Sequence, residues 1–183
     1  MTVDRILAPG EWAVLALLCE RPGHGWAIAS QLTPNGELGA VWTMGRPLVY
    51  RSLEILEERG LVEAVGSEPG VRGPNRTIFQ VTPAGQEELA EWLAEPVEHV
   101  RDVRSLLLLK LVFADRLQVD PRPMLLAQHD AVAAAVESLS LRVRRSTGSE
   151  EILLRFRLES TRAVLRFIQG CLDNEAVPAH AVG

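Results

Sequence analysis

The chain has 183 residues, of which 47% are hydrophobic, and a formal net charge of −5 at pH 7. This length suffices for one ordinary core, or for a small domain with an additional helical element. The longest apolar run, residues 106–114 interrupted by Lys110, is far shorter than the roughly 20 residues that cross a bilayer. The first residues also lack the apolar core of a secretion signal, so we expect a cytoplasmic protein without a membrane segment.

The N-terminal part of the sequence is predicted to be helical. Pro9 suits the first turn of a helix, where its missing N–H costs nothing, and the Arg-Pro-Gly at residues 21–23 ends that helix. A second, short helix is expected from residue 24 to about residue 32, with Trp26 among the side chains turned toward the core. A third helix is expected between Gly45 and Gly60, because a proline occupies its first turn and a cation followed by glycine favours a helix end.

The third helix has two distinct faces. Its apolar residues recur at i, i+4 and i+7 and predict a buried stripe formed by Val49, Leu53 and Leu56. A helix that exposes polar side chains near its N-terminal end can enter the major groove of DNA, where base edges differ in their donors and acceptors. We therefore predict DNA contacts from Thr43, Arg46, Tyr50 and Arg51. Glutamates at positions 54, 57 and 58 should hold the second half of the helix clear of the phosphates.

A β-hairpin is predicted after the third helix. Two runs of β-forming residues, 61–65 and 77–81, are separated by residues 66–75, which contain Gly, Pro and Asn. This pattern indicates antiparallel strands with a long, mobile tip. An arginine-bearing tip can lie along a phosphate strand or enter the minor groove. We expect it to contact DNA through Arg72, Asn75 and Arg76.

Helices are expected over most of the remaining chain. Thr82 and Pro83 form a cap and first-turn pair for a helix that ends at Ala94, and residues 96–101 read as a linker. Asp102 is expected to cap a helix over residues 103–117 that is apolar nearly all round. Two long helices follow, with a turn at residues 146–149. Each carries an apolar stripe, predicted as Leu125, His129, Val132, Val136, Leu139 and Val143 in the first and Leu153, Phe156, Ser160, Ala163, Phe167 and Cys171 in the second.

Together these elements predict a mainly α protein, an α+β winged helix-turn-helix followed by an antiparallel helical dimerisation arm. The expected division is a DNA-binding domain over residues 1–95, a helical dimerisation domain over residues 96–175 and a disordered tail over residues 176–183. The apolar surface left on the arm favours a homodimer. A dimer would bring two DNA-reading heads to one double-stranded DNA.

The charge distribution argues against a general attraction to DNA. Residues 1–95 contain 7 Arg and 13 Asp or Glu, a balance of −6, and residues 96–183 contain 12 Arg or Lys and 11 Asp or Glu, a balance of +1. Attraction to phosphate must therefore be local and come from a few arginines. Two other functions stay open: a winged-helix protein-interaction module without DNA affinity, and a carrier of hydrophobic ligands.

Four segments resemble the PadR-like transcriptional regulators. They are GEWAVLALLCERPGHGWAIASQL at 10–32, RPLVYRSLEILEERGLVE at 46–63, GVRGPNRTIFQVTPAG at 70–85 and VRDVRSLLLLKLVFADRL at 100–117. The His-Gly-aromatic element at 24–26 and the Leu-x-Tyr-x-x-Leu-x-x-Leu pattern at 48–56 are the most specific parts.

The resemblance implies a homodimeric regulator, usually a repressor, that binds a near-palindromic operator and releases it on binding phenolic acids, drugs or other aromatic compounds. It also implies that Tyr50 and Arg51 lie on the recognition helix and that residues 72–76 lie in the wing. The second wing strand departs from the family, since Thr77, Ile78 and Phe79 stand where paired aromatic residues are frequent.

Residue patterns typical of enzymes are missing from the sequence. It contains no Ser/His/Asp constellation, no Gly-rich phosphate loop and no CxxC pair, and its four histidines are too dispersed for a metal motif. We therefore expect neither an enzyme nor a cofactor or metal. Two tryptophans are candidates for stacking a small aromatic effector, Trp92 on the helix that leads to the arm and Trp42 before the third helix. Trp12, like Trp26, is expected to pack in the core.

Overall fold

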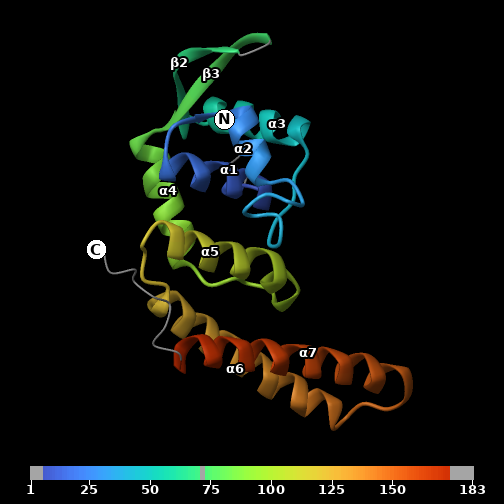
Figure 1. Cartoon of the computed structure of the whole chain (residues 1–183). Helices are drawn as coiled ribbons and strands as arrows, with labels where there is room; N and C mark the ends of the chain where they lie inside the picture. Colours follow the sequence, from blue (N-terminus) through green and yellow to red (C-terminus); the bar gives the residue numbers. More distant parts are fainter. Residues whose placement is uncertain (1–5, 71–72, 174–183) are drawn as a thin grey trace.

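The computed structural model describes residues 6–70 and 73–173, so Arg72 and the predicted tail at 176–183 lie outside the described residues. Its elements in chain order are α1 (Pro9–Glu20), β1 (Gly23–His24), α2 (Gly25–Gln31), α3 (Arg46–Glu58), β2 (Val62–Gly70), β3 (Gly73–Val81), α4 (Pro83–Ala94), η1 (Val100–Asp102), η2 (Val103–Leu107), α5 (Leu108–Arg116), α6 (Arg122–Val143) and α7 (Gly148–Asp173). Figure 1 shows the hairpin and α1 to α3 at one end, α5 in the middle, and α6 and α7 at the other end. The predicted fold class, mainly α with a small antiparallel sheet, is confirmed.

Helix α1 forms the centre of the winged-helix core. Pro9 is its first residue, as predicted, and the run from Ala13 to Leu18 is fully buried. The predicted apolar stripe of α3 packs into the same core. Burial of one such aliphatic side chain contributes roughly 1.5–3 kcal/mol, so this stripe fixes which face of α3 points outward.

Helix α2 is shorter than its neighbours and has only one buried face. His24 caps it, since its Nδ1 accepts a hydrogen bond from the backbone N–H of Ala27 at 3.0 Å. Ile28 and Ala29 are buried, but 43% of Trp26 is exposed, so the prediction that Trp26 packs in the core is wrong. Trp26 lies two positions before Ile28, about 200° around the helix, so it falls on the side opposite the buried face.

The hairpin formed by β2 and β3 is longer than predicted. Only residues 71–72 separate the two strands, so the prediction of a long tip over residues 66–75 is wrong. Register shifts between Ala64 and Gly66 and between Glu68 and Gly70 accommodate the turn-forming residues within the ladder. The strand order is β1-β3-β2, and an edge strand such as β2 tolerates Pro69 because one side of its backbone needs no partner.

Local caps set both ends of the hairpin. Gly60 has φ +70°, the left-handed conformation that glycine adopts after a helix end. Thr82 Oγ1 donates to the Gly60 carbonyl at 2.7 Å and accepts from the Gly85 N–H at 3.1 Å. The N-cap of α4 is thereby tied to the end of α3, and the predicted bounds of α4 are confirmed.

The segment between α4 and α5 is already helical before the predicted start. Residues 100–102 form a 3-10 turn and residues 103–107 a π-helical turn, and the Asp102 side chain makes no capping bond. The predicted cap at Asp102 is therefore wrong, because the backbone turns from Val100 onward and leaves Asp102 inside the helical segment. Leu109 and Phe113 of α5 belong to the winged-helix core, which thus extends past residue 95.

Helix α5 is also tied to the first two helices by charge. The Arg116 guanidinium donates to both carboxylate oxygens of Glu20, at 2.6 and 2.7 Å, and to Gln31 and Glu37 at 3.1 Å. Such bidentate arginine–carboxylate geometry fixes orientation as well as distance. It joins the C-terminal end of α5 to α1, α2 and the loop after α2.

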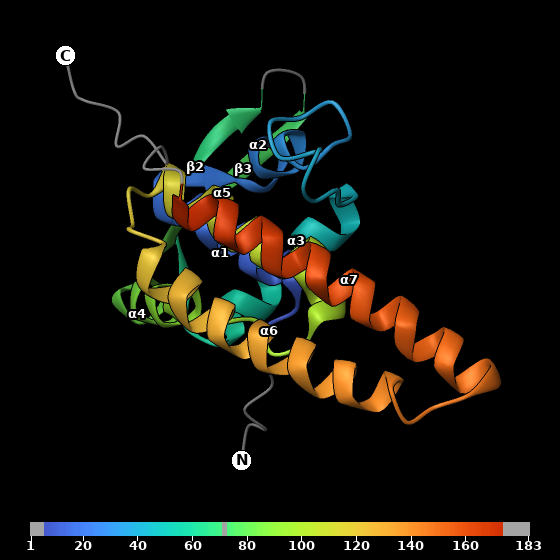
Figure 2. The ribbon, with the colours of Figure 1, turned by 90° about the horizontal axis from the view of Figure 1, so that it is seen from below.

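Helices α6 and α7 form the predicted antiparallel hairpin, and Figures 1 and 2 both show them side by side and extending beyond the remaining elements. A buried glutamine attaches them to the connector after α4. The Gln128 side chain accepts from the Val97 N–H at 2.5 Å and donates to the Val97 carbonyl at 3.0 Å. Arg122 closes the open end of the hairpin by donating to the Leu172 carbonyl at 3.1 Å.

The contact face of α7 differs from the predicted one by one position. Its buried residues are Leu154, Leu158, Thr161, Ile168 and Leu172. The predicted stripe is instead largely exposed, with 66% of Leu153, 73% of Phe156 and 42% of Phe167 accessible. Two apolar stripes run side by side on this helix, and periodicity alone cannot decide which of them faces α6.

Candidate nucleic-acid interface

The outer face of α3 presents the side chains that the sequence predicted for DNA contact. Arg46, Tyr50 and Arg51 are all exposed, and Thr43 is exposed just before the helix. Within residues 6–70 and 73–173, neither guanidinium of α3 takes part in a hydrogen bond or ion pair. Both can therefore meet a phosphate or base edge without losing an internal partner.

Tyr50 is anchored as well as exposed. Its ring lies directly on Gly25, since a Cβ added to that glycine would be 2.7 Å from the tyrosine Cε1. Any larger residue at position 25 would displace the ring. The start of α2 therefore fixes the Tyr50 hydroxyl on the outer face of α3.

Negative charge on α3 is confined to its second half. Glu54, Glu57 and Glu58 are exposed there, whereas Arg59 at the helix end pairs with Glu88 at 2.9 Å. Carboxylates repel DNA phosphates, so only the first two turns of α3 suit a DNA surface. Figure 1 shows that α3 and the hairpin lie at the end of the molecule opposite α6 and α7, which leaves this surface uncovered.

The wing strand β3 contributes Arg76, which is held by two residues at the start of α2. Its guanidinium carbon lies over the Trp26 ring, 5.1 Å from the centroid, and its Nη1 is 3.4 Å from His24 Nε2. Strand β1 makes this contact possible, because His24 pairs with Ile78 across the sheet. Asn75 is exposed beside Arg76, and the third predicted wing residue, Arg72, is outside the described residues.

The role of Trp26 at this surface was missed in the sequence. The His-Gly-Trp element at residues 24–26 carries part of the family resemblance, and the sequence predicts that its tryptophan packs in the core. The signal that could have corrected this is the small size of α2, whose two turns leave no room for a large inward aromatic residue beside Ile28. Its pairing with Arg76 depends on the sheet register and has no sequence signal.

The two tryptophans predicted for effector binding are both largely withdrawn from solvent. Trp92 is only 8% exposed, with Trp12 stacked on it at 4.7 Å and the Lys110 ammonium 4.4 Å from the ring centroid. Since two groups cannot share one ring face, both faces of Trp92 are occupied. Trp42 is half-buried against the core, and its indole N–H is buried without an acceptor in the part of the chain that the structure describes.

A small cavity of about 250 Å³ borders Trp92. Its charged lining consists of Arg59, Glu88, Glu91 and Glu95. Arg59 already pairs with Glu88, so the remaining charge at this cavity is negative. The arrangement suits a neutral or cationic aromatic molecule better than an anionic one.

The sequence contains a single lysine, Lys110, which is buried at the junction between α4 and α5. It is 3% exposed, and its ammonium donates to the Trp92 carbonyl and, at 2.9 Å, to the Glu95 carbonyl. These are carbonyls at the C-terminal end of α4, where a cation is favoured. Burial nevertheless lowers the pKa of Lys110 from 10.5 to about 8, with the nearby Glu95 carboxylate acting in the opposite direction.

No group of three or more His, Cys, Asp or Glu side chains is arranged to hold a metal ion in residues 6–70 and 73–173. Across that same part of the chain, every helix is too short or too polar to span a membrane.

Sequence comparison with known proteins supports the winged-helix assignment. Residues 14–91 match the model described as the Transcriptional regulator PadR-like family. "Probable transcriptional regulator Rv1176c" of Mycobacterium tuberculosis is 30% identical over 93 residues, which are 51% of this chain and 48% of that protein. The matched segment thus spans about half the length of this curated relative.

Solved structures with a similar arrangement include two of Bacillus subtilis PadR. The complex with operator DNA has a TM-score of 0.45 and 20% identity, and covers 88% of this chain and 96% of that chain. The complex with p-coumaric acid has a TM-score of 0.44 and 19% identity, and covers 90% of this chain and 97% of that chain. Residues 14–91, which contain α3 and the β2–β3 hairpin, are therefore similar to the PadR-like family of transcriptional regulators.

Proposed function

We propose that this protein is a transcriptional regulator that binds double-stranded DNA through α3 and the β2–β3 wing. The observation that carries the proposal is the exposed pair Arg46 and Arg51 on the first two turns of α3, with no internal partner among the described residues. An arginine that is not paired within the protein is available for bidentate contact with guanine or phosphate.

The first turns of α3 enter the major groove in this proposal. Arg46 reaches a guanine edge or a phosphate, and Tyr50 reaches a phosphate or a thymine methyl group. Arg51 clamps the backbone, and the Thr43 hydroxyl donates to a phosphate. The phosphate contacts of Arg51 and Thr43 position the protein on the DNA, whereas contacts to base edges give sequence preference.

The wing adds backbone contacts beside the groove. Arg76 is held over Trp26, on the same end of the molecule as α3, and Asn75 is exposed next to it. We propose that these two residues, with Arg72, contact a phosphate strand or the minor groove. Because the chain carries a net charge of −5, binding depends on these local cations and falls steeply with salt.

A homodimer supplies the second DNA-reading head. Helix α7 exposes four large apolar side chains, Ile152, Leu153, Phe156 and Phe167, and an exposed apolar helix face is typical of a protein interface. We propose that α7, with α6, forms the interface between two copies, and that the pair binds a near-palindromic operator as a repressor.

Ligand response is the remaining part of the proposal. The cavity beside Trp92 offers an indole edge, and its unpaired carboxylates favour a neutral or cationic aromatic effector. Trp42 does not line this cavity and stays a separate proposed effector contact, because its buried N–H lacks an acceptor among the described residues. A change in tryptophan fluorescence together with a change in DNA affinity would support this effector site.

Gel-shift titration with the DNA upstream of the gene and its neighbours tests the proposal. A specific shift that survives excess unrelated competitor DNA is expected. Loss of the shift in Arg46→Ala and Arg51→Ala, with retention in Arg145→Ala in the turn after α6, would support the assigned face. A folded protein that shifts none of these fragments at low salt would instead favour a protein-interaction module.

A further inference from the structure

The two ring nitrogens of His24 face different neighbours. Nδ1 accepts a hydrogen bond from the Ala27 N–H at 3.0 Å, which makes His24 the N-cap of α2. Nε2 lies 3.4 Å from Nη1 of Arg76 on β3. The pairing of His24 with Ile78 in the β1–β3 ladder brings these two side chains together, although 52 positions separate them in the sequence.

The capping bond decides which nitrogen of His24 carries hydrogen. A backbone N–H only donates, so Nδ1 must present a lone pair to Ala27. In a neutral imidazole the hydrogen then lies on Nε2. The opposite tautomer would set two N–H groups against each other at 3.0 Å, inside the first turn of α2. The hydrogen-bond pattern therefore assigns the Nε2–H form to His24.

With hydrogen on Nε2, the close approach of His24 and Arg76 is a contact between two donors. A guanidinium has five N–H donors and no acceptor, so no hydrogen bond can form between Nη1 and Nε2. Two donors held 3.4 Å apart can instead donate to one shared acceptor. An oxyanion is the acceptor that suits them, because a guanidinium binds it by charge-assisted hydrogen bonds.

The surroundings keep the Arg76 guanidinium in place without neutralising it. The Trp26 ring lies 5.1 Å from the guanidinium carbon, and a ring face attracts a cation without using the N–H groups of the guanidinium. Among the described residues no carboxylate pairs with Arg76, although Glu68 stands opposite it in the β2–β3 ladder. Both donors are half-buried, so part of each remains open to a ligand.

The site adjoins the face of α3 that is proposed to read DNA. Gly25 directly follows His24, and the Tyr50 ring occupies the space beside it, 2.7 Å from where a Cβ would lie. Tyr50 is one of the residues proposed to contact DNA, so the shared acceptor position lies next to that face. Phosphate oxygens of a DNA backbone are oxyanions of the required kind and line both strands of the duplex.

We propose that His24 is a DNA-contact residue, and that its Nε2–H and the Arg76 guanidinium donate to one phosphate group of the DNA backbone. Arg76 then contacts a phosphate rather than the minor groove, and His24 contributes a neutral donor beside it. The inference rests on the proposed DNA-binding function and adds to it a residue, a tautomer and a single shared phosphate.

Substitutions at position 24 separate phosphate binding from helix capping. His24→Ser keeps an oxygen that can cap the Ala27 N–H but removes the donor. It should bind the upstream DNA about two- to tenfold more weakly, as for loss of one hydrogen bond, and should melt like the wild type. His24→Gln keeps an amide N–H that extends as far as Nε2 but loses the cap, so it should bind DNA more tightly than His24→Ser. The opposite order would show that His24 acts only as a cap.

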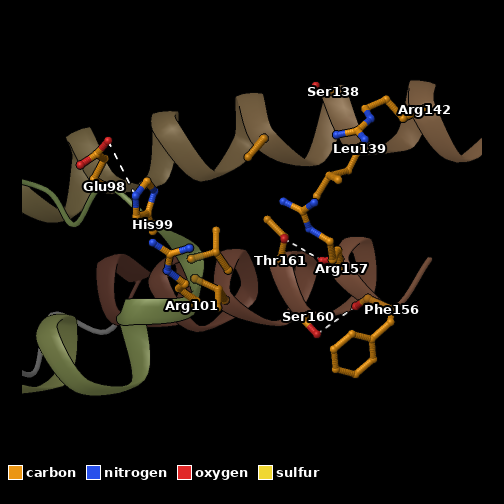
Figure 3. Close-up of a pocket in the computed structure, with 13 residues that line it drawn as sticks. Glu98, His99, Arg101, Ser138, Leu139, Arg142, Phe156, Arg157, Ser160 and Thr161 are labelled. Atoms are coloured by element: carbon orange, nitrogen blue, oxygen red, sulfur yellow. Dashed lines mark hydrogen bonds and ion pairs between the residues drawn. The ribbon is translucent and has the colours of Figure 1, made fainter. Parts of the chain in front are cut away.

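His99→Ser is the matched control for this substitution. The His99 side chain makes no capping bond and lies beside Glu98, at one end of the cavity between α6 and α7 (Figure 3). It belongs to the helical arm rather than to the surface formed by α2, α3 and the wing. His99→Ser should therefore leave DNA affinity unchanged.

Salt titration distinguishes the two donors. Because His24 donates as a neutral group, His24→Ser should lower affinity without changing the slope of log affinity against log salt concentration. Arg76→Ala should lower that slope by about one. In the double variant the two losses should be less than additive, because both remove contacts to the same phosphate. Independent losses would contradict a shared phosphate.

The tautomer and the shared phosphate can each be measured directly. A long-range nitrogen-15 NMR spectrum of the free protein should show hydrogen on Nε2 of His24, and the His24→Ser spectrum identifies the signal. Neutral methylphosphonate linkages, placed one at a time along the upstream DNA, should reveal one linkage at which neither His24→Ser nor Arg76→Ala weakens binding further.

The outcomes separate this proposal from the DNA-binding function on which it rests. Hydrogen on Nδ1 of His24 would overturn the proposal whether or not the protein binds DNA. Unchanged affinity in His24→Ser, or effects of the two substitutions that vanish at different linkages, would overturn it while the wild type still binds DNA. A wild-type protein that binds no upstream DNA would refute the proposal together with the DNA-binding function.

Discussion

The guanidinium carbon of Arg76 lies 5.1 Å from the centroid of the Trp26 ring. A wing residue and an α2 residue are thereby joined, although 50 positions separate them in the sequence. Trp26 is 43% exposed, so the contact costs little desolvation and leaves part of the guanidinium open to a phosphate. A cation–π pair at such a site contributes about 0.5–1 kcal/mol, enough to favour one orientation of the arginine.

Loss of the Trp26 ring should weaken DNA binding through Arg76. Trp26→Ala is expected to lower affinity about two- to fivefold, the equivalent of the lost cation–π contact. Arg76→Ala should also reduce the slope of log affinity against log salt concentration by about one, the change expected for one lost phosphate contact. If Trp26 acts by holding Arg76, the double variant will be less impaired than the two single effects combined.

Trp26→Phe is the control for this relationship, because it keeps an aromatic face and should retain most of the affinity. Anisotropy titrations at several salt concentrations supply both the affinity and the slope. Full additivity of Trp26→Ala and Arg76→Ala would show that the two residues act independently and would refute the positioning role.

The exposed α7 face should control self-association. Leu153→Asp places a charge in a surface that is proposed to be buried between two copies, and should shift the protein from dimer to monomer in sedimentation velocity. Val119→Asp is the matched control, an equally apolar exposed residue in the turn before α6. A Leu153→Asp protein that remains dimeric would exclude this face as the interface.

Lys110 should make stability depend on pH. Its folded pKa of about 8 is below the ordinary 10.5, so the unfolded chain binds more protons between these values and stability rises with pH across that window. The gain over the whole window is at most about 3 kcal/mol, and below pH 8 the full cost of burying the charge remains.

Lys110→Met isolates this contribution because it removes the titrating group and keeps the length of the side chain. Urea unfolding at pH 7.5 and pH 9.5 should show a larger stability increase in the wild type than in the variant. Burial raises the pKa of Cys19 to about 11, which acts in the opposite direction, but it is shared by both proteins and cancels in the comparison. Equal increases would contradict a depressed Lys110 pKa.

Much of the winged helix could be predicted from the sequence because its signals are local. Pro9, Gly60 and Thr82 mark helix ends by backbone chemistry that needs no tertiary context, and all three lie where expected. The buried stripe on α3 is equally predictable, because the charged residues on the opposite face leave only one face of the helix that can pack in the core.

The remaining differences arise from choices that tertiary packing makes. Leu153 and Leu154 are adjacent on α7, and only contact with α6 decides which of them is buried. The hairpin tip was overestimated because bulges absorb glycine and proline that usually signal a loop.

Affinity for the promoter DNA, measured by anisotropy with Arg46→Ala, Arg51→Ala and the Arg145→Ala control, tests the central claim most directly. We predict that each α3 substitution weakens specific binding about tenfold, within the 1–3 kcal/mol that one good base or phosphate contact supplies, while melting temperature and dimerisation are unchanged. Arg145→Ala should bind like the wild type. Wild-type affinity in all three variants would contradict the claim that the first turns of α3 read DNA.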